Sequence, residues 1–137
     1  MIIDHICFAV GDIQEGISYW NRTFGYDQMT DVVENSRQGV KVVFLHKDGS
    51  LAIKLIEPLA GNDSLLKFVR QGGGYHHICF KCDDLGEQME ELKAKGLRTL
   101  VPPQPGEAFN NHDIAFMRAK YALNFELIDT DERASVL

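Results

Sequence analysis

The feature that most constrains the fold is an internal repeat at one fixed offset of 72 residues. Segments and single residues that match at this spacing are His5-Ile6-Cys7-Phe8 with His77-Ile78-Cys79-Phe80, Asp12 with Asp84, Phe44 with Phe116, and Lys54-Leu55-Ile56 with Glu126-Leu127-Ile128. Because the offset holds from the start of a half to its end, the chain is predicted to contain two copies of one supersecondary unit. Two copies indicate a pseudo-symmetric pair, since a solenoid needs three or more.

The composition limits the classes of protein that need to be considered. The chain has 137 residues, of which 45% are apolar and 25% charged, as expected for one soluble domain with a real core. The net charge is −6 and the sequence contains no run of basic residues, which argues against a nucleic-acid partner. No apolar run could span a membrane, and no signal peptide is recognisable. The odd number of cysteines, three, indicates reduced core residues, so we expect a cytoplasmic protein.

Hydrophobic periodicity and turn signals predict the same order of elements, βαβββ, in each half. Each helix follows an aspartate, Asp12 or Asp84, that is suited to the N-cap. We expect an α+β fold in a single domain, divided into a first module (about 1–60), a linker helix (about 61–72), a second module (about 73–130) and a frayed tail (131–137). The stretch from Pro102 to Asn111, with three prolines, is predicted to be the longest irregular loop.

The repeat also selects four equivalent polar positions: His5, Lys54, His77 and Glu126. Side chains alternate between the two faces of a strand, and apolar residues flank Lys54 and Glu126 and follow His5 and His77. We therefore expect a curved sheet with helices on its apolar convex face and these polar groups on its concave side, where a ligand would bind. The alternative is ordinary: a strand histidine is often a hydrogen-bonded core residue, and a lysine or glutamate in an edge strand is usually solvated.

Several of these segments resemble the vicinal oxygen chelate superfamily, which includes glyoxalase I, extradiol dioxygenases, and fosfomycin- and bleomycin-resistance proteins. They are Ile3-Asp4-His5-Ile6, Phe24-Gly25, Gly74-Tyr75-His76-His77 and Phe125-Glu126-Leu127. Gln38-Gly39-Val40 and Glu57-Pro58-Leu59 bring the pattern nearest to methylmalonyl-CoA epimerases. The resemblance extends to about Thr130 and implies two βαβββ modules around a U-shaped cavity, and a homodimer.

The resemblance also implies a divalent metal (Zn, Co, Ni, Mn or Mg) held by one residue from each of four strands. In epimerases these residues are His, Gln, His and Glu, and here they fall on His5, Lys54, His77 and Glu126. A lysine ammonium has no lone pair with which to bind a metal. Two arrangements remain open: His5, His77 and Glu126 hold a metal while Lys54 is displaced or neutral, or Lys54 pairs with Glu126 and replaces the metal.

A second departure concerns the acid/base glutamate that epimerases carry on the strand after Gln-Gly-Val, because Val42 stands at its position. Epimerisation needs proton removal on one face and delivery on the other, so authentic epimerase activity is in doubt. We expect an isomerase or lyase that transfers a proton next to a carbonyl or thioester, with Glu126 as base and Lys54 stabilising negative charge. The alternative is non-catalytic binding of an antibiotic or metabolite, as in bleomycin-resistance proteins.

The substrate is expected to meet apolar walls and a polar mouth. By alternation, Val42, Phe44 and Phe116 share the concave face. Asn110 and His112 are predicted substrate contacts near the mouth, although a polar loop is equally consistent with solvated residues.

Overall fold

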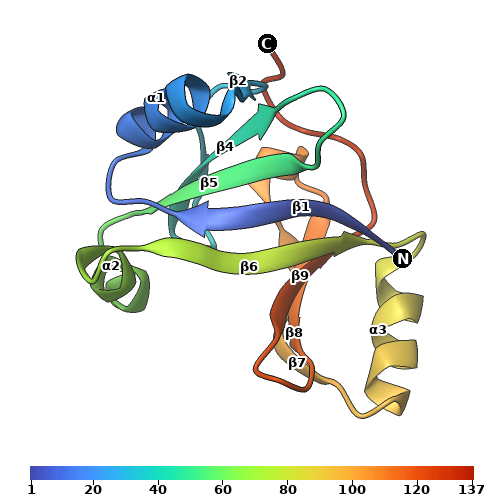
Figure 1. The fold of residues 1–137 in the computed structure, drawn as a ribbon. Coiled ribbons are helices and arrows are strands. Elements are labelled where there is room, and N and C mark those ends of the chain that lie inside the picture. Colours follow the sequence, from blue (N-terminus) through green and yellow to red (C-terminus); the bar gives the residue numbers. More distant parts are fainter.

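The computed structural model describes all residues, 1–137, and has the α+β architecture that the sequence predicts (Figure 1). Its elements in chain order are β1 (Ile2–Ala9), α1 (Ile13–Phe24), β2 (Asp27–Gln28), β3 (Val33–Asn35), β4 (Val40–His46), β5 (Ala52–Pro58), α2 (Asp63–Arg70), β6 (Gly74–Lys81), α3 (Leu85–Ala94), β7 (Arg98–Pro105), the 3₁₀ turn η1 (Glu107–Phe109), β8 (Asp113–Arg118) and β9 (Asn124–Ile128). Each half is therefore a βαβββ unit in which β2 and β3 together stand for one strand of the first half.

All strands join one sheet in the order β2-β4-β5-β1-β6-β9-β8-β7, with β3 also paired to β4. The antiparallel pair β1–β6 joins the two halves at the middle of the sheet. On either side of this pair the registers correspond, since Cys7 lies opposite Lys54 and Cys79 opposite Glu126. This arrangement brings the candidate strands β5, β1, β6 and β9 next to one another.

The helices begin where the sequence predicts, and they cover the convex face. Asp12 and Asp84 each accept a backbone N–H three residues further on, at 3.0 and 2.9 Å, which satisfies free donors of the first turn. The apolar stripe of α1, including Ile13 and Ile17, packs on β4 and β5, and that of α3, including Met89, packs on β8 and β9. Figure 1 shows the two helices beside different halves of the sheet.

The concave face carries a separate apolar cluster that surrounds the predicted polar residues. It contains Cys7, Val42, Phe44 and Ile114, with Phe116 half-buried against it, and Val42, Phe44 and Phe116 are the residues that alternation predicted here. Phe109 of η1 fills one end of the concavity and is fully buried. The chain thus buries one apolar layer under its helices and a second inside the curve of the sheet.

Two segments differ from the sequence-based prediction. The proline-rich stretch is not an irregular loop: β7 continues through Pro102 and Pro103 to Pro105. Proline lacks an N–H, but β7 is an edge strand with register shifts against β8, and these are the places where a strand tolerates proline. The expected frayed tail is also wrong, because Val136 bridges to Thr30 and the Leu137 N–H donates to the Met29 carbonyl at 3.0 Å.

No helix of the structure is both long and apolar enough to cross a membrane.

Candidate active site

Four neighbouring strands bring the four repeat-related residues together inside the concavity. The exposed fractions of these side chains are 0% for His5 (β1), 3% for Lys54 (β5), 3% for His77 (β6) and 0% for Glu126 (β9). Such burial of ionisable groups requires that they satisfy one another. The structure therefore favours the shared internal site over the alternative of unrelated solvated residues.

Glu126 is the centre of this group. Lys54 Nζ lies 3.1 Å from both carboxylate oxygens of Glu126. His5 Nε2 and His77 Nε2 lie 3.0 and 3.3 Å from Glu126 Oε1. A carboxylate only accepts hydrogen bonds, so Lys54 donates to this buried anion, and each imidazole donates to it in the tautomer that carries Nε2–H.

A second ion pair holds His5 from behind. His5 Nδ1 lies 2.7 Å from Asp4 Oδ2, and Arg133 Nη2 donates to the same oxygen at 2.5 Å. The Arg133 guanidinium also stacks 4.7 Å from the ring centroids of both Phe44 and Phe109. Arg133 therefore closes this end of the concavity and fixes Asp4 against His5.

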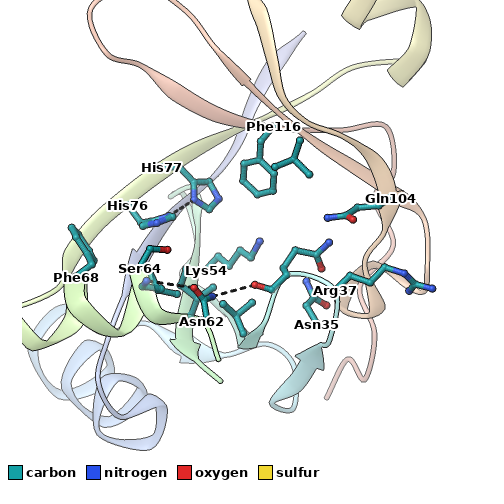
Figure 2. A pocket seen from close by; sticks show the side chains of 15 residues that line it. Asn35, Arg37, Lys54, Asn62, Ser64, Phe68, His76, His77, Gln104 and Phe116 are labelled. Carbon is teal, nitrogen blue, oxygen red and sulfur yellow. Dashed lines mark hydrogen bonds between the residues drawn. The ribbon is translucent and has the colours of Figure 1, made fainter. Parts of the chain in front are cut away.

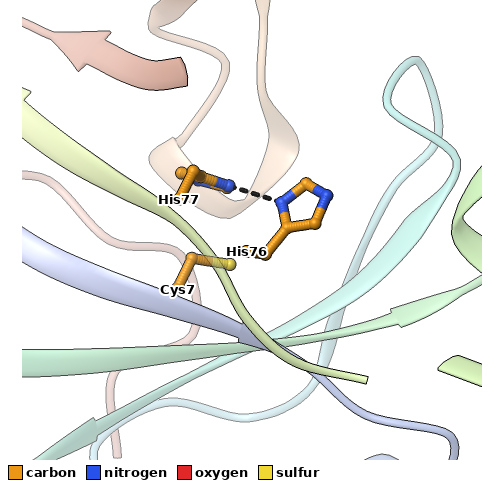
Figure 3. A group of neighbouring side chains, drawn as sticks. All are labelled: Cys7, His76 and His77. Atoms are coloured by element: carbon orange, nitrogen blue, oxygen red, sulfur yellow. Dashed lines mark hydrogen bonds between the residues drawn. The ribbon is translucent and has the colours of Figure 1, made fainter. Parts of the chain in front are cut away.

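His77 is held from its other side by His76, and the two Nδ1 atoms lie 2.7 Å apart (Figure 3). If His77 Nε2–H donates to Glu126, His77 Nδ1 accepts and His76 Nδ1–H donates. His76 Nε2 then carries a lone pair, and it makes no hydrogen bond within the protein. Cys7 lies beside both rings in Figure 3, but burial raises the pKa of its thiol to about 12, so it stays protonated.

The shifts in pKa follow from burial and from the ion pair. Burial alone would raise the pKa of Glu126, but the Lys54 ammonium and the histidine donors hold it well below its usual range. Burial opposes the charge of Lys54 as well, yet the adjacent Glu126 carboxylate raises its pKa overall. Burial lowers the pKa of His77 to about 4. The centre is thus a charged Lys54–Glu126 pair beside a neutral His77.

The three residues predicted as metal ligands lie close enough together to ask whether they could hold a metal beside the Lys54–Glu126 pair. One ligand atom from each of His5, His77 and Glu126 lies within 4.8 Å of the others. However, both oxygens of Glu126 already accept from the Lys54 ammonium, which would repel a dication in the same space. The donor set alone suits a metal, but with a charged Lys54 the site does not.

A cavity of about 560 Å³ opens beside this centre (Figure 2). Lys54, His76 and His77 line it together with apolar side chains such as Ile56, Phe68 and Phe116. Its charged lining residues are Arg37 and Lys54, without any Asp or Glu, in a chain whose net charge is −6. Because Glu126 neutralises the charge of Lys54, Arg37 is the positive group of the lining that remains to attract an anionic ligand.

The structure separates the predicted substrate-binding residues into two groups. Phe116 lines the cavity, and Val42 and Phe44 are fully buried in the concave cluster beside it. Asn110 and His112 lie elsewhere, where both contact Glu132, at 3.2 and 3.3 Å. The cavity lining does not include them.

Sequence reasoning did not select several polar residues of the cavity: Asn35, Gln38, Asn62, Ser64, His76 and Gln104. Asn62 caps α2 and donates to the carbonyls of Gln38 and Gly39, so it holds the turn before β4 against the helix. The available signal was the Gln-Gly-Val motif itself, which places Gln38 at the cavity wall. His76 could have been found as the partner of His77 in the His-His pair.

The fold and the buried centre define a protein in which paired βαβββ halves enclose one polar site between apolar walls. The model of the Glyoxalase/Bleomycin resistance protein/Dioxygenase superfamily matches residues 4–116. The chain belongs to this superfamily.

Similar proteins of known name are methylmalonyl-CoA epimerases. The mitochondrial enzyme of Dictyostelium discoideum is 26% identical over 133 residues, which are 96% of this chain and 78% of that protein. The mouse enzyme is 30% identical over 100 residues, 72% of this chain but only 55% of its own length. The epimerase structure from Mycobacterium tuberculosis has a TM-score of 0.81 at 26% identity, covering 93% of this chain and 86% of its own.

A further similar structure is that of a complex. A variant of the Streptomyces coelicolor methylmalonyl-CoA epimerase in complex with 2-nitronate-propionyl-CoA has a TM-score of 0.79 at 26% identity. The match covers 96% of this chain and 98% of that one.

Proposed function

We propose that this protein is an isomerase that moves a proton at the carbon next to the carbonyl of an acyl-CoA thioester. The similarity to methylmalonyl-CoA epimerases supports this class of reaction and substrate. The observation that carries the proposal is the Lys54 ammonium at the cavity wall, held by Glu126. Removing a proton beside a thioester places negative charge on the carbonyl oxygen, and a fixed cation in a buried site stabilises that charge.

Lys54 has the hydrogen-bonding capacity that this role requires. Two of its contacts go to the oxygens of Glu126, so the third N–H of the ammonium is left without a partner in the protein. That N–H would donate to the thioester oxygen as the oxygen becomes an enolate. Glu126 keeps Lys54 charged and fixed in position.

The proton itself requires a base that the substrate can reach. Glu126 was the base predicted from sequence, but it accepts several hydrogen bonds, has a lowered pKa and does not line the cavity. His76 lines the cavity, and burial lowers its pKa, so its ring is neutral near pH 7. We propose that His76 Nε2 takes the proton and returns it to the same carbon, and that Glu126 acts through Lys54.

The residue at position 42 affects whether proton transfer inverts the carbon next to the carbonyl. It offers no acid/base group at the position where epimerases carry a glutamate, so the opposite face of the enolate lacks a proton donor there. We expect proton exchange at the carbon next to the carbonyl to be faster than inversion at that carbon.

The test is deuterium exchange of methylmalonyl-CoA in D₂O, followed by mass spectrometry, with inversion measured in the same samples. The wild-type protein should exchange the proton well above the buffer rate. Lys54→Met and His76→Gln should each lower exchange by about 100-fold or more, because each removes a group that acts in the transition state. The matched control is Lys41→Met, which removes a lysine that pairs with Glu57 and does not line the cavity. Tight binding of the thioester without exchange would contradict the proposal and support the binding-protein alternative.

A further inference from the structure

We propose that Lys54 is a built-in replacement for a divalent cation, set in a ligand group that is otherwise complete, so that removing its charge turns the centre into a metal site. The inference rests on the proposed function only for the role of the cation, which is to stabilise an enolate oxygen. Whether a metal binds is a separate question that can be answered without any assay of activity.

The first step of the argument is the geometry of the ligand atoms. His5, His77 and Glu126 come from three neighbouring strands and face one point, with their ligand atoms within 4.8 Å of one another. Two imidazoles and one carboxylate are a donor set that binds Zn²⁺, Co²⁺ and similar ions with open positions for substrate. The strand backbones place these three residues next to one another whichever side chain stands at position 54.

The second step is that both histidines already have the outer partners that metal-bound histidines need. A histidine that ligates through Nε2 donates its Nδ1–H to a carboxylate or another acceptor, and this contact orients the ring. His5 Nδ1 faces Asp4 at 2.7 Å, and His77 Nδ1 faces His76 Nδ1 at 2.7 Å. The His76–His77 hydrogen bond can reverse its direction, since each ring has both a donor and an acceptor nitrogen when neutral.

The third step is that Lys54 occupies the position that a metal would need. Its Nζ lies 3.1 Å from both oxygens of Glu126, and its side chain is 3% exposed. The ammonium also lies 5.3 Å from the ring centroid of Phe109, which favours a cation at this place. With its positive charge adjacent, a dication would meet strong repulsion in a buried site.

The experiment is a Co²⁺ titration of wild type and Lys54→Gln, read by the visible d–d absorption of bound cobalt and by calorimetry. The Gln side chain is one bond shorter than that of Lys, carries no charge and supplies an amide oxygen. We expect Lys54→Gln to bind one Co²⁺ at least about 100-fold more tightly than wild type, because the repulsive charge is gone. Lys41→Gln, the same change at an ion pair outside the cavity, should bind no more Co²⁺ than wild type.

Two results of the titration would overturn the inference. One equivalent of Co²⁺ bound by wild type as tightly as by the variant would show that the ammonium does not exclude metal. No binding by Lys54→Gln would show that the ligand set is not preformed. If Lys54→Gln is unstable because Glu126 has lost its partner, circular dichroism with and without Co²⁺ decides: refolding by the metal supports the inference, and a chain that stays unfolded contradicts it.

Failure here and failure of the proposed function are distinguishable. Proton exchange by wild type together with absence of Co²⁺ binding by Lys54→Gln would leave the isomerase standing and remove the latent metal site. Co²⁺ binding by the variant without proton exchange by wild type would do the reverse.

Discussion

At the scale of single residues, the molecule is organised around one buried carboxylate. Glu126 accepts from Lys54, His5 and His77, and a buried carboxylate without such partners would be strongly destabilising. His5 lies between Glu126 and Asp4, so both of its ring nitrogens face carboxylate oxygens. Lys54 pairs with Glu126 and Arg133 pairs with Asp4, so each of these carboxylates has a cationic partner among the aromatic rings.

The lowered pKa of His77 predicts a loss of stability in acid. Between its ordinary value of 6.5 and the folded value of about 4, the unfolded chain binds a proton at His77 that the folded protein does not. The free energy of unfolding should therefore fall as the pH drops through this window, by roughly 3 kcal/mol from this residue.

The measurement is urea unfolding from pH 7 to pH 4 for wild type and His77→Gln. The variant should lose less stability over this range than wild type. His46→Gln, a change at an exposed strand end, is the control and should keep the wild-type profile. Equal slopes in wild type and His77→Gln would show that His77 is protonated in the folded state.

At this scale the sequence predicted which residues form the buried centre, but not which contacts they make. The repeat and the alternation of strand side chains were sufficient to select His5, Lys54, His77 and Glu126. The part played by Arg133 was not predictable, because its partners Asp4, Phe44 and Phe109 are distant in sequence and Arg133 itself lies in the tail beyond the repeat.

At the scale of elements, the C-terminal segment is part of the site. After β9 the chain turns back over the concavity, where Ala134 N–H donates to the Ala108 carbonyl at 2.9 Å and Val136 bridges to Thr30. Immediately before these contacts, Arg133 reaches Asp4 and packs on the two phenylalanine rings. The segment holds η1, and with it Phe109, in place.

Replacing Arg133 with alanine should lower the free energy of unfolding by about 3 kcal/mol, because Asp4 loses a buried ionic partner and the rings lose a desolvated cation. The matched control is Arg22→Ala on α1. Arg22 also pairs with a carboxylate, Glu15, and lies over an aromatic ring, but its side chain is 61% exposed against 8% for Arg133.

The control variant should change stability by less than about 1 kcal/mol, since exposed ion pairs are screened by water. Chemical denaturation of both variants is sufficient to compare them. Similar small effects would mean that the tail lies on the surface as a loose cover, as the sequence alone indicated.

The elements of the first half and the two long helices were predictable, since caps, periodicity and turn signals agree there. β7 was not, because its prolines indicate a loop unless the strand is known to lie at the edge of the sheet. This error also affected the mouth of the cavity. Val101 and Gln104 of β7 line the cavity, whereas Asn110 and His112, which follow β7 in the chain, contact Glu132.

At the scale of the whole molecule, the site depends on how the two halves meet. β1 and β6 form the join, and the chain enters β6 through Gly73, whose φ is +64°. A Cβ at this position would lie 2.5 Å from the Ala9 carbonyl oxygen, which belongs to the backbone of β1. Only glycine allows this approach, and the approach fixes His77 relative to His5.

Gly73→Ala should therefore lower the free energy of unfolding by more than the cost of placing an alanine at this positive φ. Gly49→Ala is the control, since Gly49 has a similar φ of +75° but nothing within 4 Å of an added Cβ. We expect about 1 kcal/mol for Gly49→Ala, and at least about 2 kcal/mol more for Gly73→Ala because β1 and β6 must separate. Thermal unfolding of both variants measures the difference, and equal effects would show that the join is not tight.

Homodimerisation, which the resemblance implies, stays a prediction at this scale, and so does the cytoplasmic location.

The sequence by itself determined the class of fold, the two halves and the identity of the four central residues, because a repeat and the alternation of strand side chains can be recognised from residue spacing alone. It also showed the two departures from the epimerase pattern, Lys54 and Val42, but left open whether Lys54 gives way to a metal or replaces it. Only the tertiary structure brought both Glu126 oxygens within 3.1 Å of Lys54 and added Asp4, His76 and Arg133 around them. The physical reason is that burial and charge pairing depend on distances between strands, and one-dimensional spacing does not encode those distances.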